Sequence, residues 1–138
     1  MSMKQILGPI LLMPLALAVP AAASAQEAIE GQWRNPKGSI VVRLAECGGG
    51  YCGTVVRASE KAKAGARKGG TANLIGTRIL SNLRPAGRGT FKGQAFEPKR
   101  NLRAPATVRL VGPDAIEVKG CAIAGVLLCK EQRWTRVG

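Results

Sequence analysis

The sequence predicts an all-β domain, a small antiparallel up-and-down β-barrel of about eight strands. Short segments alternate apolar and polar residues with a period of two, as half-buried strands do. Glycine-rich turn signals separate these segments at intervals of about ten residues, and helical spacing of apolar residues is almost absent. We expect Gly31-Gln32-Trp33 and Arg133-Trp134-Thr135-Arg136 to be the first and last strands, which meet where the sheet closes.

The first 25 residues have the composition of a cleavable secretory signal peptide. Lys4 precedes an apolar run over residues 6–19, which prolines interrupt and which is shorter than the roughly 20 residues that span a bilayer. Ala23-Ser24-Ala25 then supplies the small residues of a cleavage site. We therefore expect a mature single domain over residues 26–138, located in the periplasm or secreted, without a transmembrane segment.

Lysine and arginine outnumber aspartate and glutamate by 21 to 8, so the formal net charge is +13 at pH 7. This charge attracts polyanions and leaves two interpretations open, a solvated basic surface and a functional basic patch. The basic residues concentrate in residues 58–71 and 84–103. The first segment could form a short helix capped by Ser59, but Gly65 and Gly69-Gly70 favour a loop. The residues expected to contact a ligand or polyanion are Lys61, Lys63, Arg67, Lys68, Arg88, Lys99, Arg100 and Arg103.

The four cysteines all lie in the exported part of the chain, where an even number predicts two disulfides. Zinc is the rival interpretation, but the C-x4-C and C-x7-C spacings are not those of a zinc ribbon. The chain-entropy model favours a crossed bridge between Cys47 and Cys121, which would stabilise the fold by about 4.5 kcal/mol. Each local bridge would stabilise it by about 2–2.5 kcal/mol. Turn geometry favours the local pairs Cys47–Cys52 and Cys121–Cys129, which we expect.

The turn geometry of the first pair follows from its glycines. A two-residue turn at Gly49-Gly50 would place Cys47 opposite Cys52 in a hairpin, with Cα atoms about 4.5–5.5 Å apart. A disulfide requires a separation in this range. The second pair is centred on Gly125, so a short loop at residues 124–126 would place Cys121 opposite Cys129.

The remaining strands follow from alternation. Ile40, Val42 and Leu44 share one face of a segment whose other face carries Arg43. Residues 77–84 are ambiguous because apolar residues recur there at helical spacing, although the short length favours a strand. After the first strand, the predicted strands are residues 39–46, 52–57, 77–84, 90–96, 107–111, 115–119 and 130–137.

The combination of Gly31-x-Trp33 on the first strand with an arginine on the last resembles the lipocalin and calycin arrangement. In those proteins the tryptophan closes one end of an antiparallel barrel and the arginine packs across its ring. An indole face attracts a guanidinium by about 1–2 kcal/mol when the pair is desolvated. The resemblance implies that Gly31, Trp33 and Trp134 close the barrel with Arg136, or with Arg133 as the second candidate.

Most of the mature chain resembles a family of small exported bacterial proteins known as domain of unknown function 2147, which looks calycin-like in fold. Two segments depart from the family pattern. Residues 58–71 lack the aspartate and Asn-Pro that members commonly carry, and residues 97–103 replace a segment that reads Asp-Pro-x-x-Gly-Lys-x-Tyr. If these loops rim the barrel mouth, the ligand differs in charge from that of relatives. The matching pieces are Gly31-Gln32-Trp33, Cys47…Cys52-Gly53, Ile75-Gly76, Gly93…Pro98, Val118-Lys119-Gly120-Cys121 and Trp134-Thr135-Arg136-Val137.

Several kinds of catalytic machinery are missing from the sequence. The chain has no histidine, the commonest general base and metal ligand. None of its serines lies in a G-x-S-x-G motif, and oxidised cysteines supply no thiolate. Glu97 and Glu117 are better explained as partners in surface salt bridges than as catalytic carboxylates. We expect a protein that is not an enzyme and that uses neither a metal nor a cofactor.

These features predict an exported binding protein, a small barrel whose cavity or mouth holds a small apolar or anionic molecule. One alternative is a polyanion-binding envelope protein that contacts lipopolysaccharide, anionic lipid or polysaccharide through the basic segments. Another is a structural or inhibitory partner of a second envelope protein. Export disfavours nucleic acid, as does the small number of aromatic residues, five in the chain, that could stack on bases.

Overall fold

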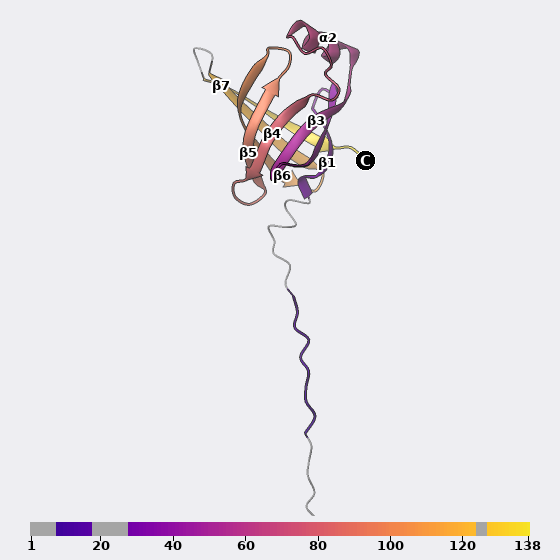
Figure 1. Ribbon diagram of the computed structural model, residues 1–138, viewed down its shortest axis with the longest axis vertical. Coiled ribbons are helices and arrows are strands. Elements are labelled where there is room, and N and C mark those ends of the chain that lie inside the picture. The colour runs from indigo at the N-terminus through magenta and orange to yellow at the C-terminus, as the bar shows by residue number, and fades with distance from the viewer. Residues whose placement is uncertain (1–7, 18–27, 124–126) are drawn as a thin grey trace, which may run out of the picture.

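The structure, a computed structural model, describes residues 8–17, 28–123 and 127–138. Its strands form one closed antiparallel barrel in the order β1 to β8, and helix α2 lies between β3 and β4 (Figure 1). The predicted all-β up-and-down barrel is therefore confirmed. The elements are β1 (Gly31–Arg34), β2 (Ile40–Cys47), β3 (Gly50–Ala58), α2 (Glu60–Lys68), β4 (Arg78–Pro85), β5 (Thr90–Glu97), β6 (Leu102–Gly112), β7 (Ala115–Ile123) and β8 (Leu127–Arg136).

The segment before the barrel is described only in part. Residues 8–17 have no regular secondary structure, and their large apolar side chains are exposed as the chain extends away from the barrel (Figure 1). The expected cleavage after residue 25 lies outside the described residues, so the signal peptide stays a prediction. Within the described ranges, no helix is long and apolar enough to cross a membrane.

The up-and-down connectivity gives the barrel two distinct ends. The β2–β3, β4–β5 and β6–β7 turns lie at one end, together with residues 28–30 and the C-terminus, and we call this the Trp33 end. The connection that contains α2 lies at the other end with the β5–β6 turn, residues 98–101, and we call this the α2 end (Figure 1). The first and last strands close the barrel, since Trp33 pairs with Arg136 across β1 and β8.

A single hydrophobic cluster occupies the interior between these ends. Its aromatic members include Trp33, Phe91 and Trp134, and Leu44 and Val108 are among its fully buried residues. The alternation of the strands produces this packing, because every second residue of each strand faces inward. Side chains therefore fill much of the space that a wider barrel would leave for a ligand.

Strand β4 explains the ambiguous sequence pattern of residues 77–84. Its pairing with β5 shifts register between Ser81 and Arg84, and Asn82 has a positive φ of 53°. Leu80 and Leu83 are consequently both buried although they are three positions apart. A bulge of this kind produces a spacing of three in a strand, which resembles that of a helix.

The segment expected to be a loop is instead helix α2. Ser59 caps the helix by accepting a hydrogen bond of 3.1 Å from the backbone N–H of Ala62. Glu60 lies in the first turn and Arg67 in the last, as the helix dipole favours. Ala66 is 2% exposed and packs against the core, so burial offsets the low helix propensity of Gly65.

Both local disulfides are present, so the crossed pairing is wrong. Cys121 and Cys129 lie directly opposite each other with Cα atoms 4.1 Å apart, although the loop at residues 124–126 is outside the described residues. The first hairpin differs in register from the prediction, because its turn residues are Gly48 and Gly49, both with positive φ. Cys47 is therefore a diagonal neighbour of its partner, at a Cα separation of 5.9 Å.

Candidate ligand-binding site

At the Trp33 end, Arg136 connects the first and last strands. Its guanidinium lies 4.2 Å from the centre of the Trp33 ring. It donates hydrogen bonds to the backbone carbonyls of Ala28 at 2.5 Å, Glu30 at 2.9 Å and Pro113 at 3.1 Å. The Trp33 ring is fully buried, and its Nε1 donates to a carbonyl of the same N-terminal segment. The N-terminal segment, the β6–β7 turn and both end strands thus meet at one side chain.

Gly31 is required beside this arginine for two reasons. A Cβ at residue 31 would lie 2.6 Å from Nη1 of Arg136, closer than a Cβ approaches another heavy atom, so the guanidinium would have to leave its hydrogen bonds with the backbone. The backbone of Gly31 also has a φ of +130°, a conformation that residues with a side chain rarely adopt. The Gly-x-Trp spacing therefore follows from the space that the guanidinium occupies.

At the α2 end, parts of the two basic segments of the sequence lie against each other. A Cβ on Gly65 would lie 3.7 Å from Cγ of Lys99, so the middle of α2 contacts the β5–β6 turn. A Cβ on Gly69 would overlap the carbonyl oxygen of Pro98, so the helix ends directly on that turn. Helix α2, from the first basic segment, therefore lies beside the β5–β6 turn, from the second.

A depression of about 380 Å³ opens beside α2, and we call it the α2 depression. Two cationic side chains of the helix, Lys63 and Arg67, contribute one wall. The other wall is more apolar, since Leu74 is buried and Ile75 is 47% exposed. The depression is lined by Lys63, Arg67, Ala72, Asn73, Leu74 and Ile75.

Backbone hydrogen bonds hold the second wall in place. The N–H of Gly76 donates to the carbonyl of Val55 on β3 at 2.8 Å, and the N–H of Thr77 donates to the carbonyl of Leu74 at 3.0 Å. The Thr77 hydroxyl donates to the carbonyl of Asn73 at 2.6 Å. The residues that face α2 across the depression are therefore fixed to the barrel wall.

The charge on the helix wall is partly balanced. Lys63 donates a hydrogen bond of 2.7 Å to Glu60, and this bond lowers the pKa of that carboxyl below its usual value. The Lys63 side chain is 29% exposed, so its ammonium group has access to the solvent and to a ligand. Lysine is a compact cation with three donors, whereas arginine offers a planar fork suited to a carboxylate or phosphate. Lys63 and Arg67 together can hold an oxyanion.

The structure separates the other predicted contact residues. Lys61 and Lys68 are exposed on α2 but do not line the depression. Lys99 lies in the adjoining β5–β6 turn, and Arg100 there is 3.8 Å from Glu97. Arg88 lies in the β4–β5 turn at the Trp33 end, far along the barrel from the rest. The last of the predicted contact residues is Arg103, and its guanidinium lies 4.7 Å from the centre of the Phe96 ring.

Arg133 lies on the outer wall rather than at the barrel seam. It is 3.7 Å from Glu117, which also accepts a short hydrogen bond from Arg109 on the neighbouring strand. The hydrogen bond from Arg109 is the main reason that the pKa of Glu117 lies below its usual value. Glu97 and Glu117 thus take part in surface salt bridges, as predicted from the sequence.

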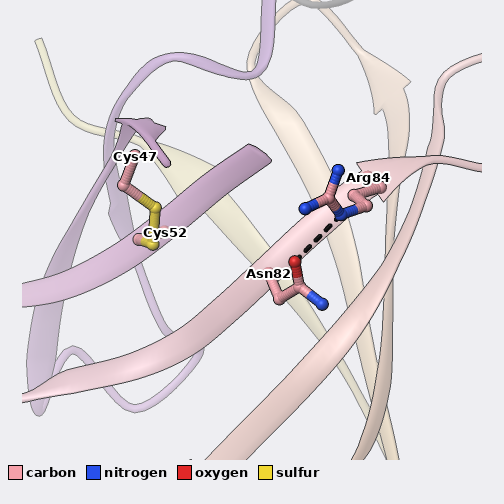
Figure 2. The surroundings of a disulfide bond; sticks show 4 residues. All are labelled: Cys47, Cys52, Asn82 and Arg84. Atoms are coloured by element: carbon pink, nitrogen blue, oxygen red, sulfur yellow. Dashed lines mark hydrogen bonds between the residues drawn. A yellow bond between two sulfur atoms is a disulfide. The ribbon is translucent and has the colours of Figure 1, made fainter. Parts of the chain in front are cut away.

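A second depression, of about 250 Å³, lies outside the barrel on β2, β3 and β4, and sequence reasoning missed it. We call it the Arg43 groove. Arg43 and Arg78 are single basic residues in separate strands, so no sequence cluster indicates them. Figure 2 shows the nearby disulfide on the β2–β3 hairpin and, on β4, the 2.9 Å hydrogen bond from Arg84 to Asn82. The groove is lined by Arg43, Ala45, Glu46, Cys47, Cys52, Thr54, Val56 and Arg78.

The family assignment follows from a match that spans the whole barrel. A family model described as "Uncharacterized protein conserved in bacteria (DUF2147)" matches residues 31–136, from the first residue of β1 to the last of β8. The chain belongs to this family. The match includes the Gly31 and Trp33 seam and both disulfides. No curated protein matches the DUF2147 chain significantly.

Among solved structures, the DUF2147 chain is similar to protein HP1028 from Helicobacter pylori, which is described as belonging to the lipocalin family. The two share 15% sequence identity and superimpose with a TM-score of 0.61 over 80% of this chain and 83% of the other. This similarity shows a lipocalin-like fold. Within the described part of the chain, no three potential metal ligands lie together.

Proposed function

We propose that this DUF2147 protein is an exported, non-catalytic binding protein for a small molecule that combines an anionic group with an apolar part. The α2 depression carries the proposal, because Lys63 and Arg67 line it together with Leu74 and Ile75. Its volume of about 380 Å³ is of the size that binds small molecules, roughly 300–1,000 Å³.

The two walls have complementary roles. An anionic group between Lys63 and Arg67 would accept hydrogen bonds that each contribute about 1.5–3 kcal/mol. An apolar part would cover Ile75, which is 47% exposed, and would gain about 25 cal/mol for each Å² removed from water. A ligand with both parts therefore binds more tightly than either part alone.

The lipocalin-like fold supports a binding role by analogy. Barrels of about eight strands can hold one small ligand, although a fold by itself does not define a function. Here Trp33, Phe91 and Trp134 belong to a packed interior, whereas the α2 depression is open to solvent. The proposed site therefore lies at the α2 end of the barrel rather than in its lumen.

Titration calorimetry with three matched probes tests the proposal. Octyl phosphate carries both parts, whereas inorganic phosphate and 1-octanol each carry one. We expect octyl phosphate to bind at least tenfold more tightly than the other two, a difference of about 1.4 kcal/mol. Equal affinity for octyl phosphate and either single-part probe would contradict the proposal.

Helix α2 supplies a matched pair of variants for the same titration. Lys63→Gln with Arg67→Gln removes the two cations that line the depression, and Lys61→Gln with Lys68→Gln removes two cations of the same helix that do not. We expect the first double variant to weaken octyl phosphate binding about tenfold or more. The second should remain within about twofold of the parent.

A polyanion-binding role is the second candidate, favoured by the contact of α2 with the β5–β6 turn. Each lysine or arginine near a membrane that contains anionic lipid contributes about 1 kcal/mol to binding, largely independent of its exact position on the protein surface. Vesicles of phosphatidylglycerol should then bind the protein in a salt-dependent manner. Both double variants should weaken that binding equally, which distinguishes this role from the small-ligand site.

Export rests on the leader of 25 residues and on the two disulfides, which form in oxidising compartments. The mass of the protein recovered from the periplasm or medium should correspond to a chain that begins at Gln26. A chain recovered only from the cytoplasm, with residues 1–25 retained, would contradict export.

A further inference from the structure

We infer that the Arg43 groove is a second binding site, specific for a small free molecule that carries one oxyanion group on an apolar body. It lies on the outer wall of β2, β3 and β4 and shares no residue with the α2 depression. The inference therefore does not depend on the function proposed for α2.

Strand register places two guanidinium groups around one hydroxyl. Arg43 on β2 lies opposite Thr54 on β3, and Thr54 in turn lies opposite Arg78 on β4. Directly opposite residues project from the same face of a sheet, so the three side chains form a row across the outer wall. All three line the same depression of about 250 Å³.

Neither arginine has a carboxylate partner among the described residues. The ion pairs of the described chain involve Arg100, Arg109, Arg133, Arg136 and Lys63, but not Arg43 or Arg78. Both arginines are exposed, so their forks are available to solvent. Arginine forks bind planar or tetrahedral oxyanions through paired hydrogen bonds, and the threonine hydroxyl can donate a further one.

The remainder of the groove favours an apolar body over a second negative charge. Ala45 and Val56 are half-buried, and Cys52 is 6% exposed beside them. The disulfide to Cys47 holds this part of the wall on the β2–β3 hairpin (Figure 2). Glu46 also lines the groove, and its carboxylate would repel a second anionic group.

Three small probes separate the components of this recognition, and two of them, the sulfonate and the sulfonamide, match in size and shape. 4-Methylbenzenesulfonate has both the oxyanion and the apolar body, inorganic sulfate has only the oxyanion, and 4-methylbenzenesulfonamide is the neutral analogue. Amide chemical shifts of the isotopically labelled protein report the place and strength of binding. We expect the sulfonate to bind about tenfold more tightly than either of the other probes, with saturable shifts at Arg43, Thr54 and Arg78.

The variants provide the decisive comparison. Arg43→Gln and Arg78→Gln should each weaken sulfonate binding about tenfold, and Arg43→Lys should restore part of the loss because it keeps the charge without the fork. Lys92 and Lys119 flank Thr107 in the same three-strand register on β5, β6 and β7, outside the groove. Lys92→Gln with Lys119→Gln is therefore the matched control, and it should change the affinity less than twofold.

Three results would overturn the inference. The first is equal affinity for the sulfonate and the neutral sulfonamide. The second is an unchanged affinity in the Arg43→Gln and Arg78→Gln variants, whose folding is checked by their amide spectra. The third is an equal loss in the Lys92 and Lys119 control, which would show attraction to the overall charge. In the Lys63 and Arg67 double variant, the shifts at Arg43, Thr54 and Arg78 should titrate with the same affinity as in the parent, so failure at one site is distinguishable from failure at the other.

Discussion

Replacement of Arg136 by alanine should destabilise the whole barrel, because this side chain connects segments that are otherwise far apart in sequence. It donates three hydrogen bonds to backbone carbonyls and covers the Trp33 ring. Such bonds contribute about 1.5–3 kcal/mol each, and the ring contact contributes about 1–2 kcal/mol when desolvated. Because the side chain is 27% exposed, water can replace part of these contacts, and we expect a loss below the sum of even the lower values, about 3–5 kcal/mol.

Urea unfolding followed by tryptophan fluorescence measures this loss. With a slope of about 1.5 kcal/mol per molar urea, the midpoint of Arg136→Ala should fall by about 2–3 M. Arg136→Lys should lie between the parent and the alanine variant, since lysine keeps the charge but cannot reach three carbonyls at once.

Arg133 supplies the matched control for this experiment. It lies three positions earlier on β8, its side chain is 65% exposed, and its guanidinium lies 3.7 Å from the carboxylate of Glu117. Arg133→Ala should change the free energy of unfolding by no more than about 0.5 kcal/mol. If Arg136→Ala cost no more than Arg133→Ala, the interpretation of the seam as a structural connection would be wrong.

Three further predictions concern single residues of the barrel. Gly31→Ala should destabilise the protein by about 2–3 kcal/mol, because its Cβ would lie 2.6 Å from Arg136 Nη1 at a φ of +130°; a loss under about 0.5 kcal/mol in thermal unfolding would contradict this. Ser59→Ala should cost about 1 kcal/mol through the lost helix cap, whereas Ser59→Asp should not; equal midpoints for the two would count against the cap. The hydrogen bond from Arg109 holds the pKa of Glu117 below its usual 4.5. The ionised carboxylate therefore stabilises the folded state above pH 4.5, and this stabilisation is lost as the pH falls through the lowered pKa. The stability difference between the parent and Glu117→Gln should therefore be present at pH 7 and vanish in acid, and a difference that grew on acidification would refute the assignment.

The barrel could be predicted from sequence because its determinants are local or lie at the chain ends. Alternation in residues 39–46 depends only on the period of a strand, and it appears as β2. The Gly31 and Trp33 spacing, together with a terminal arginine, indicated that the two ends meet. Figure 1 shows the result, a barrel in which the last strand returns to the first.

Elements that depend on tertiary packing were predicted less well. The preference for a loop at residues 58–71 counted the cost of Gly65 but not the burial of Ala66 against the core, which only the folded barrel provides. Likewise, a turn at Gly49-Gly50 and one at Gly48-Gly49 are almost equivalent in sequence. The pairing of Cys47 with Gly50 along the ladder selects the second.

The candidate sites could be predicted only in part. Sequence identified Lys63 and Arg67 as members of a basic cluster but not their separation from Lys61 and Lys68, which depends on the direction each side chain takes from the helix. It gave no indication of the Arg43 groove, because the register of three strands creates that row of side chains. The register between neighbouring strands leaves no local signal in the sequence.

The place where octyl phosphate binds tests the central claim most directly. Amide chemical shifts measured during a titration should change around Lys63, Arg67 and residues 72–75 on the α2 end. Changes confined to inward-facing core residues such as Phe91 and Val108 would show instead that the ligand enters the lumen, and they would contradict a binding site beside α2.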